Sequence, residues 1–128
     1  MTVTLREILA VGAGSFCGGA ARMLTSRLLQ PHNLAFPLGT LAVNTAGCFL
    51  LGLISCLLGR GFDLSPSWRL FLTVGFCGGF TTFSTFVSET GHLAAEGLTL
   101  SALGYASLSL ILGFAALWAG NSVGRLIL

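Results

Sequence analysis

Apolar residues along the chain are gathered into long uncharged runs that short polar stretches separate. Uncharged runs cover residues 28–59, 70–88 and 97–124, and each can supply the roughly 20 residues that an α-helix needs to cross a bilayer. A shorter apolar run covers residues 8–21 and becomes long enough when Arg22 is included. The pattern therefore predicts four membrane-spanning helices and no strands.

Turn and cap signals between the runs predict where the helices end. We expect helices over about residues 5–29, from after Pro37 to about residue 59, over about 68–95 and over about 99–126. Short polar loops join them, and no linker, low-complexity tract or strong internal repeat interrupts the chain. Residues 1–128 are predicted to form a single four-helix transmembrane domain.

The third helix contains the least regular stretch, GFCGGFTTFSTF, which starts at Gly75. Gly75, Gly78 and Gly79 each weaken a helix by about 1 kcal/mol relative to alanine, and the hydroxyl residues that follow offer the backbone other hydrogen bonds. We predict a break between Gly78 and Thr81, with the helix restarting by Phe83.

Such a break has consequences at membrane depth. Its freed backbone groups must be buried in protein or line a wet cavity, and transporters place ion sites at unwound segments of this kind. A plainer interpretation is a small-residue packing face, because Gly75 and Gly79 are four residues apart.

Composition and charge narrow the class of protein. The chain is 54% hydrophobic and 8% charged, so it lacks the polar surface of a soluble domain and is predicted to be an integral membrane protein. A net charge of +2 is too small for nucleic-acid binding. The four cysteines form no CxxC pair, so they are interpreted as small buried hydrophobic residues.

The arginines give only a weak preference for one orientation in the membrane. Four helices would place Arg6, Arg60, Arg69 and Arg125 on one side, against Arg22 and Arg27 on the other. This bias weakly favours cytoplasmic termini and leaves room for insertion both ways round. Because one four-helix bundle is too thin to enclose a pore, we expect a homo-oligomer, and a twofold axis through the break would duplicate its free carbonyls.

A few polar residues lie in apolar helices and require an explanation. Asn44 needs hydrogen-bond partners, so it faces either another helix or a polar path. Arg22 is either an interfacial anchor or a functional cation. Tyr105 and Ser109 are four residues apart and share a helical face, although a tyrosine near an interface is also typical of an aromatic belt.

Three motifs together resemble the fluoride channel family called Fluc, or CrcB. They are GGAAR, ending at Arg22; GTLAVNTAGCFLLG, which contains Asn44; and GFCGGFTTFSTF, followed by Glu89. The resemblance covers nearly the whole chain and is weakest in the fourth helix. It implies an antiparallel, dual-topology homodimer with two pores in the inner membrane of a prokaryote, which exports fluoride and holds a structural sodium ion (Na+) at the dimer centre.

The resemblance also implies roles for individual residues. Phe83 and Phe86 would be the aromatic pair along the fluoride path, Asn44 an anion contact and Arg22 a vestibule cation. The remaining members of the polar path would be Thr40, Ser84, Thr85, Tyr105 and Ser109. Gly78 and Thr81 would bind the sodium ion through their backbone carbonyls.

Physical chemistry supports an aromatic anion path of this kind. Phe83 and Phe86 are three residues apart and share a face, and the edge of a phenyl ring is electropositive. Rings that turn their edges to a small anion can replace water without holding the ion too tightly to release it. Ordinary core packing of the two rings is the alternative.

Other classes of protein fit the chain less well. A small dual-topology, proton-coupled exporter with four helices matches the size, but it would call for a carboxylate within the membrane, and no acid lies in the second helix. A non-transporting assembly subunit would explain the glycines but not Asn44. The sequence contains no constellation of acid, base or metal ligands typical of an intramembrane enzyme, so the chain is not expected to be an enzyme.

Overall fold

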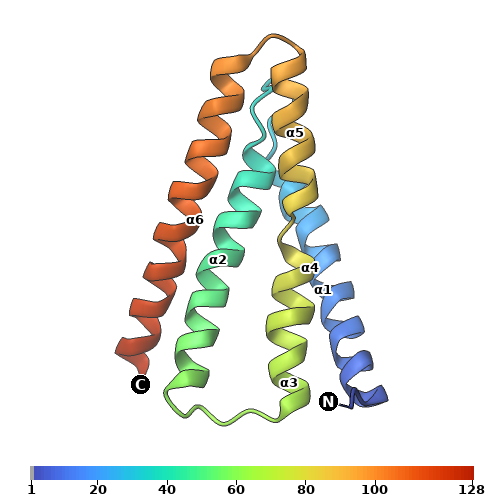
Figure 1. The fold of residues 1–128 in the computed structure, drawn as a ribbon, viewed down its shortest axis with the longest axis vertical. Coiled ribbons are helices and arrows are strands. Elements are labelled where there is room, and N and C mark those ends of the chain that lie inside the picture. Colours follow the sequence, from blue (N-terminus) through green and yellow to red (C-terminus); the bar gives the residue numbers. More distant parts are fainter. Residues whose placement is uncertain (1) are drawn as a thin grey trace.

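The computed structural model describes residues 2–128, and these form an all-helical bundle. The elements are α1 (Leu5–Leu29), α2 (Leu38–Gly59), α3 (Pro66–Leu70), the π-helical segment η1 (Phe71–Cys77), α4 (Gly78–Phe80), α5 (Phe83–Ala95) and α6 (Thr99–Ile127). The elements α3, η1, α4 and α5 follow one another end to end and together form the third membrane span (Figure 1). The bundle thus has four long apolar helices that can each cross a membrane. Both termini and the loop between α2 and α3 lie at the same end of the bundle (Figure 1).

The helix ends agree closely with the sequence prediction because their capping signals are local. Thr4 and Glu7 form a reciprocal capping box at the start of α1, and Ser65 caps α3, which has Pro66 in its first turn. The third helix therefore starts two residues before the predicted position. Gly61 and Gly97 adopt positive φ angles in the loops that follow α2 and α5.

The break in the third helix is confirmed, but it is narrower than predicted. Gly78 is helical, and only Thr81 and Thr82 are extended, with ψ angles of 159° and 118°. The irregularity instead reaches back along the chain, because the seven residues of η1 are wound as a π-helix. Such segments are rare and often lie at functional sites.

Glycines pack the helices in two pairs. A Cβ atom on Gly75 would lie 2.9 Å from the Cα atom of Gly14, and one on Gly79 would lie 2.7 Å from the carbonyl oxygen of Ser15, so α1 meets the broken helix backbone to backbone. On the other side of the bundle, Gly52 and Gly120 allow the same close approach of α2 and α6. The packing interpretation of Gly75 and Gly79 is thus correct alongside the break.

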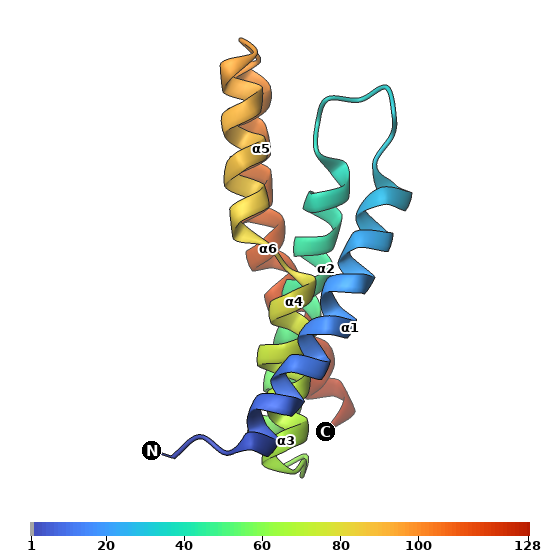
Figure 2. The ribbon, with the colours of Figure 1, turned by 90° about the vertical axis from the view of Figure 1, so that its right-hand side faces the viewer.

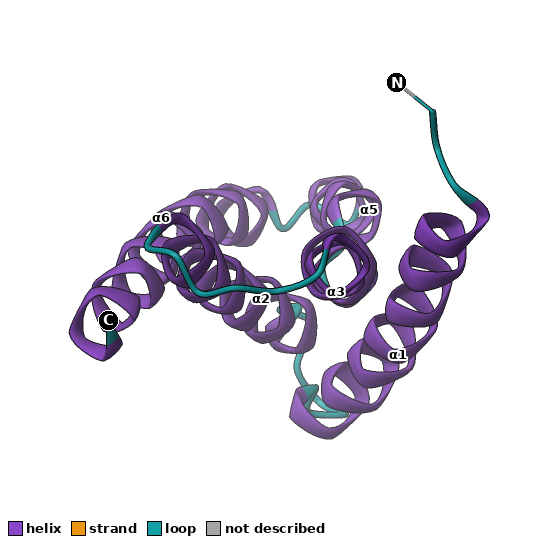
Figure 3. Cartoon of the chain, turned by 90° about the horizontal axis from the view of Figure 1, so that it is seen from below, coloured by secondary structure: helices purple, strands orange, loops and turns teal. Residues whose placement is uncertain are grey.

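Seen from below, α3 lies between α1 on one side and the paired α2 and α6 on the other (Figure 3). Large apolar side chains remain exposed on the outside, among them Phe16 on α1 and Trp118 on α6, which are 78% and 71% exposed. This surface suits lipid or a second copy of the chain. Cys56 and Cys77 are buried as expected, whereas Cys17 is exposed on the bundle surface, which contradicts the expectation for that cysteine.

Candidate functional site

The break is stabilised by threonine side chains on both of its sides. The carbonyl of Cys77 accepts hydrogen bonds from the backbone N–H of Thr81 at 3.0 Å and from its hydroxyl at 2.9 Å. Thr82 then caps α5, since its Oγ1 accepts the backbone N–H of Thr85. The hydroxyl of Thr82 also lies 3.0 Å from that of Thr85. Thr81 and Thr82, whose hydroxyls disfavour a continuous helix, therefore cap the two helix ends at the break.

Asn44 holds the extended backbone in place from α2. Its Oδ1 accepts the N–H of Thr82 at 2.8 Å, and its Nδ2 donates to the carbonyl of Thr82 at 3.0 Å. One side-chain amide thus pairs with both polar groups of an unwound residue, much as a neighbouring β-strand would. The predicted need of Asn44 for partners is confirmed, and one of its two amide N–H groups donates no hydrogen bond within residues 2–128.

Arg22 also contacts the break. Its Nε donates to the carbonyl of Gly79 at 3.0 Å, and the side chain is half-buried. The carbonyls of Gly78 and Thr81 accept no hydrogen bond from any group in residues 2–128. A Cβ atom on Gly78 would meet nothing within 4 Å, so that side of the break is open in a single chain.

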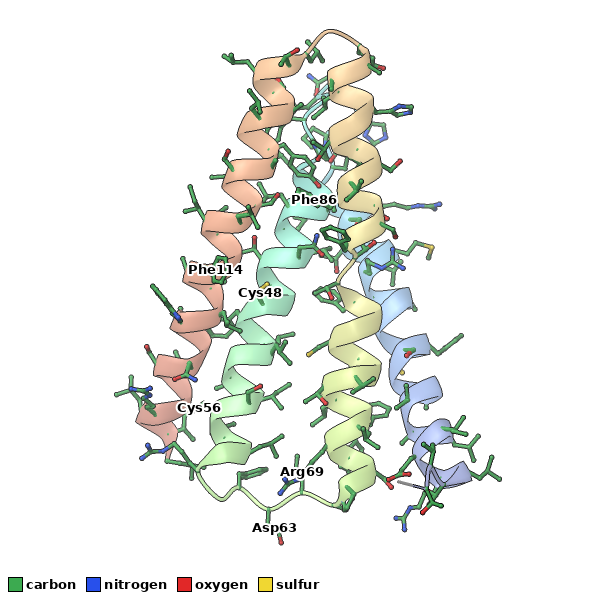
Figure 4. All side chains as sticks on the ribbon, viewed as in Figure 1. Cys48, Cys56, Asp63, Arg69, Phe86 and Phe114 are labelled. Atoms are coloured by element: carbon green, nitrogen blue, oxygen red, sulfur yellow. The ribbon has the colours of Figure 1, made fainter. Side chains whose placement is uncertain are left out.

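A groove of about 440 Å³ runs beside the break, between α2, the broken helix and α6, and we name it the phenylalanine groove. Figure 4 labels one of its lining residues on each side, namely Cys48 on α2, Phe86 on α5 and Phe114 on α6. The residues that line it are Asn44, Gly47, Cys48, Leu51, Thr73, Cys77, Gly78, Thr81, Thr82, Phe83, Phe86, Ser109, Leu110, Gly113, Phe114 and Leu117. None of these side chains is charged.

Two features make this groove suitable for a small anion. The ring centroids of Phe83 and Phe86 lie 5.9 Å apart with the rings tilted by 42°, and Phe83 is 77% exposed in the single chain. The Oγ atom of Ser109 is the one buried side-chain oxygen or nitrogen in residues 2–128 that lacks a hydrogen-bond partner. An unpaired buried hydroxyl is costly unless a ligand or water uses it.

Beyond Phe86 the structure reveals a hydrogen-bonded group that sequence reasoning did not identify. The two carboxylate oxygens of Glu89 accept the hydroxyls of Thr40 and Tyr105, each at 2.7 Å. The ring of Tyr105 lies 5.2 Å from that of Phe86, so this Glu89 junction adjoins the phenylalanine groove. Tyr105 is fully buried, which shows that the aromatic-belt interpretation is wrong.

A sequence signal for Glu89 existed. It lies three residues after Phe86 and therefore on the same helical face. Its two partners come from α2 and α6, far away in the sequence, so only the packing of three helices identifies the junction.

A second groove, of about 470 Å³, opens on the other side of the Glu89 junction, and we name it the charged groove. Figure 2 shows why it exists, since α5 diverges there from the end of α1 and the start of α2. The residues that line it are Ser26, Arg27, Gln30, Ala35, Pro37, Gly39, Thr40, Glu89, His92, Leu93 and Glu96.

The structure brings most of the predicted site residues together. Phe83, Phe86, Asn44 and Ser109 share the phenylalanine groove, and Thr40 and Tyr105 meet at the Glu89 junction. The others lie apart: Thr85 is bonded to Thr82, Ser84 is exposed and lines neither groove, and Arg22 lies against the carbonyl of Gly79.

Four helices that are each long and apolar enough to cross a membrane define a multi-pass membrane protein. A model of the CrcB-like protein family, also described as camphor resistance (CrcB), matches residues 9–121. The chain belongs to this family, as the sequence resemblance predicted.

Curated relatives extend over almost the whole chain. A protein of Chlorobaculum tepidum is 45% identical over 97% of this chain and 98% of its own length, and one of Acidobacterium capsulatum is 48% identical over 94% and 98%. A third, from Serratia proteamaculans, is 43% identical over 83% and 84%. All three are named fluoride-specific ion channel FluC. These bacterial relatives are named as channels and not as enzymes, which agrees with the expected class and does not favour a proton-coupled exporter.

Proposed function

We propose that this protein is a fluoride-selective channel that lets fluoride leave the cell down its electrochemical gradient. The observation that carries the proposal is the alignment of an uncharged groove, lined by Phe83, Phe86 and Ser109, with the hydroxyl and carboxylate groups of the Glu89 junction. The names of the relatives support fluoride as the ion.

Each part of the path would replace part of the water around fluoride. In the phenylalanine groove the ring edges of Phe83 and Phe86 and the unpaired hydroxyl of Ser109 would face the ion, and the second amide N–H of Asn44 would add a donor. No full positive charge lines this groove, so the ion is held weakly enough to leave.

At Glu89 a fluoride ion would exchange hydrogen-bond donors with the carboxylate. The carboxylate accepts hydrogen bonds from the hydroxyls of Thr40 and Tyr105, so a passing fluoride ion must compete for the same two donors. This competition gives a site that ions pass without being trapped.

The direct test is anion efflux from liposomes that contain the purified protein. Fluoride efflux should follow the fluoride gradient and the membrane voltage, should persist when a proton ionophore removes any pH gradient, and should far exceed chloride efflux. Equal efflux of chloride would overturn the proposed selectivity. A requirement for a proton gradient would instead favour the proton-coupled exporter.

We further propose that two antiparallel copies form the working channel. A single chain leaves Phe83 exposed and leaves Gly78 facing open space at the break. Because an added Cβ atom at Gly78 touches nothing in its own chain, Gly78→Ala should weaken association only if a second copy packs there. Crosslinking should show less dimer for Gly78→Ala than for Gly12→Ala, an equally open position on α1. Equal dimer yields would contradict a twofold axis at the break.

The antiparallel arrangement has its own test. Reporters fused to the carboxyl terminus should be found on both sides of the membrane, because the arginine bias is weak. A single orientation, together with crosslinks of parallel copies only, would overturn this part of the proposal.

A sodium ion at the dimer centre completes the proposal. The carbonyls of Gly78 and Thr81 have no hydrogen-bond partner in residues 2–128, while Arg22 occupies the Gly79 carbonyl between them. Oxygen-only ligands suit a hard cation, and a second copy would double their number. Fluoride flux and dimer stability should both fall after exhaustive removal of sodium and recover on its return. Unchanged flux in verified sodium-free buffer would contradict a structural sodium ion.

A further inference from the structure

The charged groove carries more charge than the proposed conduction path requires. Glu89 and His92 share one face of α5, and Glu96 follows at the C-cap of that helix, seven residues after Glu89. They face Arg27 on α1 across the groove, while α2 and the loop before it contribute only residues without charge. Arg27, His92 and Glu96 are all exposed in the single chain.

The groove ends at the path itself. Thr40 and Glu89 line its wall and are also the hydrogen-bonded pair of the Glu89 junction. An anion that travels between bulk water and the phenylalanine groove by this route therefore passes the side chains of Arg27, His92 and Glu96.

The balance of charge in the groove depends on one histidine. One guanidinium stands against two carboxylates, so the groove carries an excess of one negative charge while His92 is neutral. Protonation of His92 cancels that excess. Histidine is the side chain whose charge ordinarily changes between about pH 5 and pH 8.

We propose that His92 adjusts the access of fluoride to the channel with pH, because its protonation removes the net negative charge of the groove that leads to the Glu89 junction. This inference rests on the proposed fluoride channel. Fluoride flux is therefore expected to be higher at about pH 6 than at about pH 8. A unit charge several ångströms from an ion in a wet groove changes the local ion concentration by about twofold, and salt screens the effect.

The test compares fluoride efflux from liposomes at about pH 8 and about pH 6, the range in which an imidazole changes charge. The same buffer is used on both sides at low ionic strength, and leakage measured in protein-free vesicles is subtracted. We expect a flux about twofold higher at the lower pH for the parent protein. His92→Gln should remove this difference. His32→Gln should retain it, because His32 lies in the α1–α2 loop and does not line the groove.

A second variant changes the same charge without touching the histidine. Glu96→Gln removes one carboxylate from the groove permanently, so its flux at about pH 8 should already reach the value that the parent protein shows at about pH 6. A parent protein whose flux does not change with pH, an unchanged pH ratio in His92→Gln, or a lost ratio in His32→Gln would overturn the role of His92. Absence of protein-dependent fluoride flux at both pH values would overturn the channel function itself, and this inference with it.

Discussion

The two grooves lie on either side of the Glu89 junction, and their linings differ in charge. The phenylalanine groove is lined by aromatic rings, hydroxyls and one amide, and all of its side chains are uncharged. The charged groove has a guanidinium, an imidazole and two carboxylates around a similar volume. Charge can gather or repel an ion where water screens it, but in a dry passage it would hold or exclude the ion outright.

The two grooves also depend on different structural features of the bundle. The walls of the phenylalanine groove depend on the break, which Asn44 holds in a fixed position. The charged groove depends only on the divergence of α5 from α1 (Figure 2). We therefore expect substitutions around the break to have large effects and substitutions in the charged groove to have small, salt-dependent ones.

The largest expected effect is on the aromatic pair. Phe83→Ile or Phe86→Ile keeps an apolar side chain but removes the ring edge, so fluoride flux should fall at least about tenfold, the loss that corresponds to about 1.4 kcal/mol. Liposome efflux of the assembled protein measures it. Phe16→Ile is the control, because Phe16 is exposed on α1 and lines neither groove. If both variants conduct fluoride as fast as the parent protein, the two aromatic rings do not form the fluoride path.

The next effect concerns the support of the break. Asn44→Ala leaves the half-buried N–H and carbonyl of Thr82 without their partner, which costs at most about 1–3 kcal/mol for each group. The midpoint of thermal unfolding should fall, together with fluoride flux. Asn121→Ala is the matched control, since within residues 2–128 the Asn121 side chain forms a hydrogen bond only with the exposed Arg125 side chain. Equal thermal midpoints for the two variants would show that the break holds its shape without Asn44.

A smaller effect is expected where α1 supports the broken helix. Gly75→Ala would press a methyl group against Gly14, and overpacking of this kind costs about 1–3 kcal/mol. Gly12→Ala, with nothing within 4 Å of its added carbon, should leave stability unchanged or slightly increased because alanine favours helices. Thermal unfolding of the two variants compares them directly, and equal stability would mean that α1 can move away from the break.

The smallest loss of fluoride flux among these variants is expected at the Glu89 junction. Tyr105→Phe removes one hydrogen bond to a carboxylate, worth about 1.5–3 kcal/mol before the apolar ring recovers part of it. Fluoride flux should fall less than in Phe86→Ile, since the ring that contacts Phe86 remains. A larger loss than in Phe86→Ile would shift the decisive step from the aromatic pair to the Glu89 junction.

Local signals in the sequence determined the helices and much of the break. Apolar runs of membrane-spanning length set the four spans, and Pro37, Ser65 and the capping box at Thr4 set their ends within a residue or two. The family resemblance named Phe83, Phe86, Asn44 and Ser109 together, and all four line one groove. These features follow from residues within a few positions of one another, or from motifs that the family shares.

Tertiary structure decided what lies across helix interfaces. The sequence showed that Asn44 needed partners, but only the approach of α2 to the break identified both backbone groups of Thr82 as those partners. Glu89 acquired its meaning from Thr40 on α2 and Tyr105 on α6. The charged groove exists because α5 diverges from α1. Helical periodicity specifies which face a side chain occupies, whereas the packing of the helices determines what that face meets.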